Sequence, residues 1–161
     1  MNKEDFEKIC DINNLYNAYK KSKHKDLNFQ SNTTEELQRL KQELETKIYK
    51  VSPYHEFTVY EPKERLIKAC SFKDKVVQHS ICDNVLLPKL KEEFIQTNYA
   101  GQIGKGTHYG LNYLKAQMYL AYCKYGYDCW IIKADISKYF YNINHDILKD
   151  IVRMHIKDDD V

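Results

Sequence analysis

Residues 130–145 read WIIKADISKYFYNINH, and the interpretation of the whole chain depends on this stretch. A short apolar run ends in one acid, Asp135, and two aromatic residues follow four and five positions later. We expect residues 128–135 to form a buried strand, because short apolar runs between turn-forming residues are typical of core strands. An aspartate at the end of such a strand would occupy a fixed place, although aspartate also suits turns and helix caps.

The carboxylate of Asp135 is a candidate ligand for a divalent cation, because hard cations such as Mg²⁺ prefer oxygen ligands. The peptide carbonyl of Ile136 could face the same ion. Phe140 would lie about one turn further along, where its flat ring could press on a bound sugar. Packing in a core is the other role open to Phe140, and a helix cap is the other role open to Asp135.

Composition limits the kinds of protein that this chain can be. Its 161 residues suffice for one core, and 25 Lys and Arg against 23 Asp and Glu give a net charge of only +2. A generally basic nucleic-acid-binding protein is therefore excluded, and any binding face must come from local clustering. The 14 tyrosines could line the edge of a core or provide surfaces on which bases stack.

The cysteines and the hydropathy pattern indicate a compartment. The five cysteines are scattered and contain no Cys-x-x-Cys pair, which argues against a disulfide framework and against a zinc site. No apolar run approaches the length of a membrane span, and the N-terminus lacks the pattern of a signal peptide. We therefore expect a cytoplasmic protein with reduced thiols and no membrane partner.

Apolar residues at helical spacing predict several helices. One helix is expected over residues 6–19, and another after a capping box formed by Thr33 and Glu36, with an apolar stripe that runs to Ile48. A third would be capped by Asp74 and would end near Pro88. The remaining two are a long helix from Thr107 to Gly126 and a last helix capped by Asn144.

Residues 54–70 alternate like strands around residues 61–64, so we expect an antiparallel hairpin. Lys63 and Arg65 would point to the same side of its second strand, and Lys68 follows within the same six residues. Two cations on one face could grip a triphosphate, which needs several donors at once. Ordinary solvated charges on an exposed hairpin are the alternative. Helices with one hairpin and one strand make the expected fold class α+β.

Four blocks in this order resemble reverse transcriptases of bacterial retroelements, of the diversity-generating and group II intron type. The blocks are EPKERLI at 61–67, FKDKVVQH at 72–79, NYAGQIGKGTH at 98–108 and KADISKYF at 133–140. The resemblance implies a helix-rich fingers region over residues 1–125 and the first part of a right-hand palm over residues 126–161, together one compact unit. It also implies RNA-directed DNA polymerase activity on an RNA template, a DNA primer and deoxynucleoside triphosphates.

The resemblance also implies roles for individual residues. Asp135 would be the catalytic aspartate and, with the Ile136 carbonyl, would hold Mg²⁺ or Mn²⁺. Phe140 would exclude ribonucleotides. The nucleotide would further contact Lys63, Arg65, Lys75, Ser137 and Tyr139, and the template would contact Gly104, Lys105, Gly106 and Thr107.

Two departures from the family pattern weaken the implied grip on nucleotide and template. Lys75 stands where arginine is usual, which keeps the charge but loses the two-pronged hydrogen bonding. Gln102 stands where arginine is common.

The family's later aromatic-x-Asp-Asp motif is not found after residue 135, and the acids at 158–160 lack a flanking apolar strand. We therefore expect an incomplete polymerase domain that is inactive alone. The alternatives are an inactive RNA- or DNA-binding module, and a helical domain whose matches reflect only packing.

Overall fold

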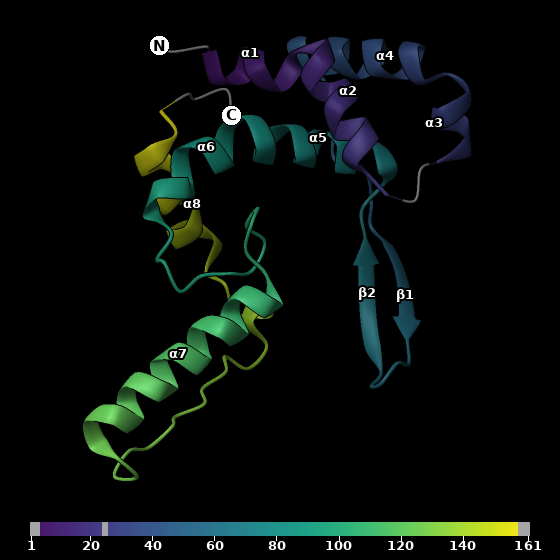
Figure 1. Ribbon diagram of the computed structural model, residues 1–161. Coiled ribbons are helices and arrows are strands. Elements are labelled where there is room, and N and C mark those ends of the chain that lie inside the picture. Colours follow the sequence, from purple (N-terminus) through teal and green to yellow (C-terminus); the bar gives the residue numbers. More distant parts are fainter. Residues whose placement is uncertain (1–3, 24–25, 158–161) are drawn as a thin grey trace. The chain divides into compact units, whose positions relative to one another are not determined.

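The computed structural model describes residues 4–23 and 26–157, and it confirms the α+β class. The chain divides into two compact units (Figure 1). The first contains the residues up to Leu90 together with those from Asp150 onward, and the second is Lys91–Lys149. The assignment of residues 1–125 to fingers and of 126–161 to a palm stays a prediction, as does the identity of the palm. The acids at 158–160 lie outside the described residues.

The first unit contains most of the helices and a two-stranded hairpin. Its elements are α1 (Glu4–Cys10), α2 (Ile12–Lys21), α3 (Leu27–Ser31), α4 (Thr33–Glu45), β1 (His55–Val59), β2 (Arg65–Ala69), α5 (Phe72–Ile81), a π-helical turn (Cys82–Leu86) and α6 (Leu87–Leu90). The second unit contains short 3₁₀ turns (Lys91–Glu93 and Tyr139–Tyr141) and α7 (Thr107–Tyr125). Helix α8 (His145–His155) begins in the second unit and ends in the first.

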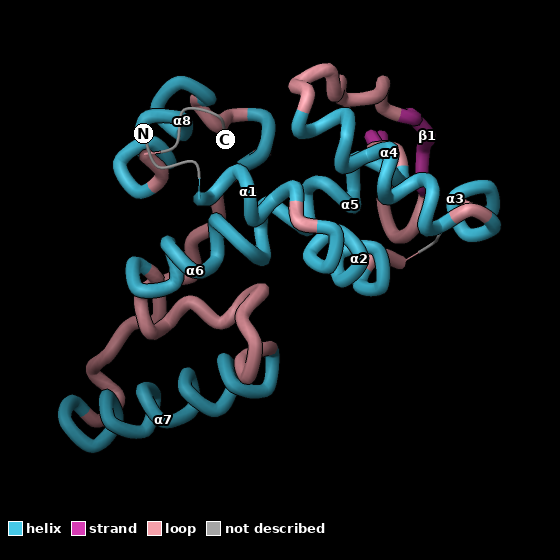
Figure 2. The backbone as a smooth tube through the Cα atoms, turned by 90° about the horizontal axis from the view of Figure 1, so that it is seen from above, coloured by secondary structure: helices cyan, strands magenta, loops and turns pink. Residues whose placement is uncertain are grey.

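The core of the first unit lies between α2, α4 and α5 (Figure 2). Leu15, Leu40 and Val76 are its fully buried side chains from these three helices. The rings of Tyr19 and Phe29 stack with centroids 5.8 Å apart, and Phe72 meets both of them edge-on. Aromatic pairs of this geometry add to the stabilisation from burial alone. A smaller cluster joins Ile9, Val85 and Ile156.

The expected first helix is two helices, because the chain breaks at Asp11. The Asp11 carboxylate accepts hydrogen bonds from the amides of Asn13 (2.9 Å) and Asn14 (3.0 Å) and so caps α2. The prediction of one helix was wrong because apolar spacing continues across the break. A cap competes with helix continuation whenever its side chain can reach the next free amides.

Helix α4 confirms a predicted helix but not its predicted cap. Leu37, Leu40 and Leu44 are buried as expected, whereas Ile48 lies beyond the helix and is 65% exposed. Thr33 is already helical, and its hydroxyl donates to the carbonyls of the preceding turn instead of accepting an amide. The capping box was therefore wrong. A threonine hydroxyl that reaches a carbonyl one turn back is no longer free to cap.

Helix α5 also has a different cap from the one predicted. The Ser71 hydroxyl accepts the amide of Asp74 (3.1 Å), so Ser71 is the cap and Asp74 is the third helical residue. The expected continuation through Val85 is present, but it passes through the π-helical turn. Pro88 lies in α6, which follows the π-helical turn without a break.

The hairpin confirms the predicted antiparallel pair. Glu56 lies opposite Lys68, Phe57 opposite Ile67 and Val59 opposite Arg65. Pairing ends at Val59 and Arg65, and residues 60–64 form the connecting turn. Lys63 therefore lies in the connecting loop rather than on β2, contrary to expectation.

Residues 128–135 do not form the expected strand and are not buried; they run as loop after α7 (Figure 2). Trp130 is 95% exposed and Ile132 is 89% exposed. A strand needs a neighbour to bond with, and the β1–β2 hairpin is the sole sheet in residues 4–23 and 26–157. The prediction failed because the sequence shows a tendency to be a strand but not the presence of a partner.

Helix α7 begins and ends as predicted, and α8 begins as predicted. Helix α7 runs from Thr107 to Gly126, which ends it with a positive φ of 63°, a conformation that favours glycine. Asn144 caps α8 by accepting the amides of Asp146 and Ile147. Exposed apolar side chains surround α7 on every side. No helix in the described ranges is both long and apolar enough to cross a bilayer.

Candidate nucleotide and metal site

Asp135 lies at a surface hollow of about 430 Å³, lined also by Ala134, Ile136 and Tyr139. A tight turn after the apolar segment shapes this hollow. Lys138 adopts the left-handed conformation (φ 50°), and its carbonyl accepts the amides of Tyr141 (3.0 Å) and Asn142 (3.2 Å). Left-handed backbone is uncommon outside glycine and often occurs at functional sites. The structure therefore brings together three predicted site residues, Asp135, Ile136 and Tyr139.

The aromatic residue beside Asp135 is Tyr139 and not Phe140. The ring of Phe140 is 81% exposed and does not line the hollow. It meets the ring of Tyr139 edge-on, with centroids 5.3 Å apart. The carbonyl of Ser137 accepts the side-chain amide of Asn142 (3.1 Å), so this predicted contact residue helps to hold the turn. Spacing alone does not tell which of two neighbouring rings faces the acid.

The oxygen donors at the hollow suit a hard cation in type but are few in number. Asp135 supplies a carboxylate and Ile136 supplies a peptide carbonyl. Among residues 4–23 and 26–157, no three His, Cys, Asp or Glu side chains gather as metal ligands. Mg²⁺ commonly binds through one or two carboxylates and completes its octahedron with water and substrate phosphates. The oxygen donors of the hollow therefore supply part of the ligand set that such an ion needs.

The cations of the hairpin do not share one face. Arg65 lies on the face of Val59 and Ile67, whereas Lys68 lies on the other face, opposite Glu56. Lys68 forms a salt bridge of 2.7 Å with Glu56. Residues three apart on a strand point to opposite sides, so Lys68 does not share the face of Arg65.

Lys63 and Arg65 have exposed side chains, and within the described part of the chain neither forms a salt bridge. Lys75 is half-buried on α5. These three predicted nucleotide contacts belong to the first unit, whereas Asp135 and the residues around it belong to the second. The hairpin loop thus presents two cations to solvent, which is what a phosphate ligand would require.

The glycine-rich loop before α7 is held by the residues predicted to touch template. The ammonium of Lys105 donates to the carbonyls of Gln96 (3.3 Å) and Asn98 (3.2 Å). The side-chain amide of Gln102 also donates to Asn98 (2.7 Å). An arginine at position 102 would place a positive charge here, which a hydrogen bond to this carbonyl does not require. Lys105 is thus directed into its own loop.

The other predicted template residues form the exit from this loop. Gly104 has a φ of 78°, Gly106 is extended, and Thr107 is the first residue of α7. The ring of Tyr99 covers Gly110, where a Cβ atom would lie only 2.7 Å from it. Glycine at 110 therefore permits the loop to pack closely on the first turns of α7.

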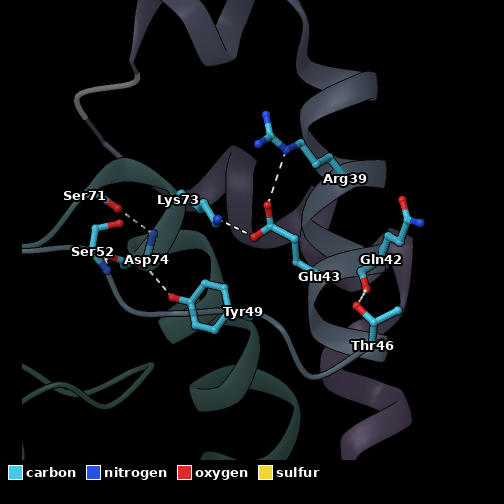
Figure 3. Close-up of polar contacts among 9 residues, drawn as sticks. All are labelled: Arg39, Gln42, Glu43, Thr46, Tyr49, Ser52, Ser71, Lys73 and Asp74. Atoms are coloured by element: carbon cyan, nitrogen blue, oxygen red, sulfur yellow. Dashed lines mark hydrogen bonds and ion pairs between the residues drawn. The ribbon is translucent and has the colours of Figure 1, made fainter.

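A buried carboxylate at the base of the hairpin was missed as a site by the sequence reasoning (Figure 3). The side chain of Asp74 accepts the Tyr49 hydroxyl (2.6 Å) and the Ser52 amide (3.0 Å), and Asp74 is 1% exposed. Burial alone would raise the pKa of Asp74, but hydrogen bonds from Tyr49, Ser71 and Ser52 outweigh it and lower the pKa. The spacing Ser71-x-x-Asp74 could have pointed to this residue, because a serine three residues before an acid is typical of the start of a helix.

The lowered pKa of Asp74 predicts a loss of stability in acid. A group with a depressed pKa contributes stability that is fully present above its unfolded pKa, about 3.9 for aspartate, and that is lost as the pH falls through its folded pKa. We expect the free energy of unfolding to fall below about pH 4 and Asp74→Asn to flatten that fall. Urea unfolding at several pH values measures both effects. An unchanged slope in Asp74→Asn would contradict this assignment.

The cysteines provide no further site. All five are free thiols, and burial raises the pKa of Cys10 to about 11. A thiol with a raised pKa is a poor nucleophile and a poor metal ligand. Cys10 therefore acts as a small apolar core residue.

No protein-family model matches the chain. A search of the curated proteins likewise finds no match.

Proposed function

We propose that this chain carries the fingers and the first part of the palm of an RNA-directed DNA polymerase. The proposal is carried by Asp135, which lies in an open hollow directly after an exposed apolar segment of strand-like sequence. In a polymerase palm, neighbouring strands would pair with such a segment and bury it. The four sequence blocks in family order support the same proposal.

The resemblance to reverse transcriptases gives these residues their proposed roles. Asp135 would bind the cations that align primer and nucleotide, and the Ile136 carbonyl would add one oxygen ligand. Lys63 and Arg65 would neutralise charge on the triphosphate, because both are exposed at the end of the hairpin. Tyr139 lines the hollow and would contact the nucleotide there.

The remaining predicted residues have proposed roles of their own. Phe140, with its exposed ring, would limit the space for a 2′-hydroxyl group. Lys75 would add charge from α5. Gly104, Gly106 and Thr107 would let template pass close to the backbone, while Lys105 would keep the loop in shape. Divalent cations, when bound, would stabilise the negative charge that develops during nucleotidyl transfer.

Primer extension tests this proposal. The protein encoded by the whole open reading frame around these codons is incubated with an RNA template, an annealed DNA primer, deoxynucleoside triphosphates and Mg²⁺. We expect extension that stops when the cation is removed by chelation. If the reading frame encodes no further acidic palm motif and the protein binds RNA without extending a primer, the proposal is wrong and a binding module remains.

A further inference from the structure

The strands of the hairpin contribute no residue to either described core cluster. Most side chains of β1 and β2 are exposed, and none is fully buried. The strands project away from the helices of the first unit (Figure 1). A two-stranded ribbon is marginally stable and has no face packed on a core to fix its direction. Its orientation must therefore be fixed where the chain enters β1 and leaves β2.

One residue, Asp74, bonds to both of these points, to the first through its carboxylate and to the second through its backbone amide. Ser52 lies three residues before β1, and its amide donates to Oδ2 of Asp74 (3.0 Å). Ser71 lies two residues after β2, and its hydroxyl accepts the amide of Asp74 (3.1 Å). The entry and the exit of the hairpin are thus joined through one residue of α5. Hydrogen bonds to a charged group are stronger than those between neutral groups.

The same carboxylate is tied to α4 through Tyr49 (Figure 3). The Tyr49 hydroxyl donates to Oδ1 of Asp74 (2.6 Å), and the Tyr49 amide donates to the carbonyl of Glu43 (3.0 Å). Lys73 lies with its ammonium 5.3 Å from the centre of the Tyr49 ring and pairs with the carboxylate of Glu43. Arg39, one turn before Glu43 on α4, also pairs with the Glu43 carboxylate (3.4 Å).

We propose that Asp74 is a positioning residue that fixes the direction in which the hairpin presents Lys63 and Arg65. Its carboxylate acts through the amide of Ser52 and the hydroxyl of Tyr49, while its own amide is capped by Ser71, and it does not touch a ligand. Its importance for triphosphate binding rests on the proposed function, whereas its control of the hairpin direction rests on the hydrogen bonds alone. Both carboxylate oxygens are used, so no isosteric residue replaces it.

Residual dipolar couplings of backbone amides test the proposal in the 161-residue chain. In the unmodified protein, one alignment tensor should fit the amides of β1 and β2 together with those of α4 and α5. In Asp74→Ala, the hairpin couplings should no longer fit the tensor of the helices. The interstrand amides should remain protected from hydrogen exchange, because the β1–β2 ladder does not use Asp74.

The matched control is Asp5→Asn. Asp5 is a buried carboxylate of the same unit, 6% exposed and paired with Lys89, with no bond to the hairpin. One tensor should still fit both parts in this variant. If Asp74→Ala does not fold, Asp74→Asn is read by the same criterion, since it replaces one of the two accepting oxygens with an NH₂ group, which cannot accept a hydrogen bond.

If one common tensor still fits the hairpin and the helices in Asp74→Ala, the proposal is overturned. Loss of the interstrand protection in that variant would overturn it as well. A titration with inorganic tripolyphosphate separates this result from the proposed function. Binding that weakens in Asp74→Ala and in Arg65→Ala, but not in Asp5→Asn, extends the positioning role to the ligand. Absence of binding to the unmodified chain counts against the triphosphate role of the hairpin and leaves the orientation result intact.

Discussion

Replacing Asp135 with asparagine is expected to reduce primer extension at least about a thousandfold, which corresponds to a loss of about 4 kcal/mol of transition-state stabilisation. Asparagine keeps the size of the side chain but removes the charge that, in the proposed function, would bind a divalent cation. Metal ions supply several kcal/mol of charge stabilisation in such reactions. Single-turnover extension with the whole encoded protein measures the effect.

The matched control for this prediction is Asp128→Asn. Asp128 is also exposed and lies in the same unit, seven positions before Asp135, but it does not line the hollow. We expect Asp128→Asn to retain nearly full activity, and circular dichroism should show the same helix content in both variants. Equal activity of the two variants would mean that Asp135 is not part of the catalytic centre.

Replacing Leu15 with alanine is expected to lower the free energy of unfolding by about 2–5 kcal/mol. Leu15 of α2 has no exposed surface and packs in the small core between α2, α4 and α5. Removal of three carbons there leaves a cavity that the surrounding helices fill only in part. Urea unfolding followed by circular dichroism measures the loss.

Leu27→Ala is the control, because Leu27 starts α3 and is 80% exposed. Its substitution should change the free energy of unfolding by no more than about 0.5 kcal/mol. Similar losses in the two variants would mean that the core of the first unit is not the one described.

The sequence predicts the helices of this protein better than it predicts their ends. The stripe Leu37, Leu40 and Leu44 was correct because burial follows helical periodicity. The capping box at Thr33 was wrong because its hydroxyl had a second partner within reach, the carbonyls of the turn before it. Asp11 was missed as a cap for the opposite reason, since a regular apolar pattern runs across it. Which side chain caps a helix depends on competition between nearby donors and acceptors, and a sequence pattern does not show which of them prevails.

The residues that line the hollow were predicted better than the local structure around them. Asp135, Ile136 and Tyr139 do lie together, but the strand expected beneath them is not formed. Strand formation depends on a distant partner, so it cannot be deduced from residues 128–135 alone. The inward direction of Lys105 depends on the fold of its own loop. Asp74 gained its role from Tyr49 and Ser52, which are remote in sequence and adjacent only after folding.

Trp130 makes the exposed segment before Asp135 observable by spectroscopy. It is the single tryptophan of the chain and is 95% exposed, so its fluorescence reports the polarity of this one place without any label. Emission should be that of an indole in water, readily quenched by iodide or acrylamide. Any strand, domain or nucleic acid that covers the segment would shift the emission to shorter wavelength and shield it from quenchers. The chain thus contains a natural probe for whatever completes its unpaired surface.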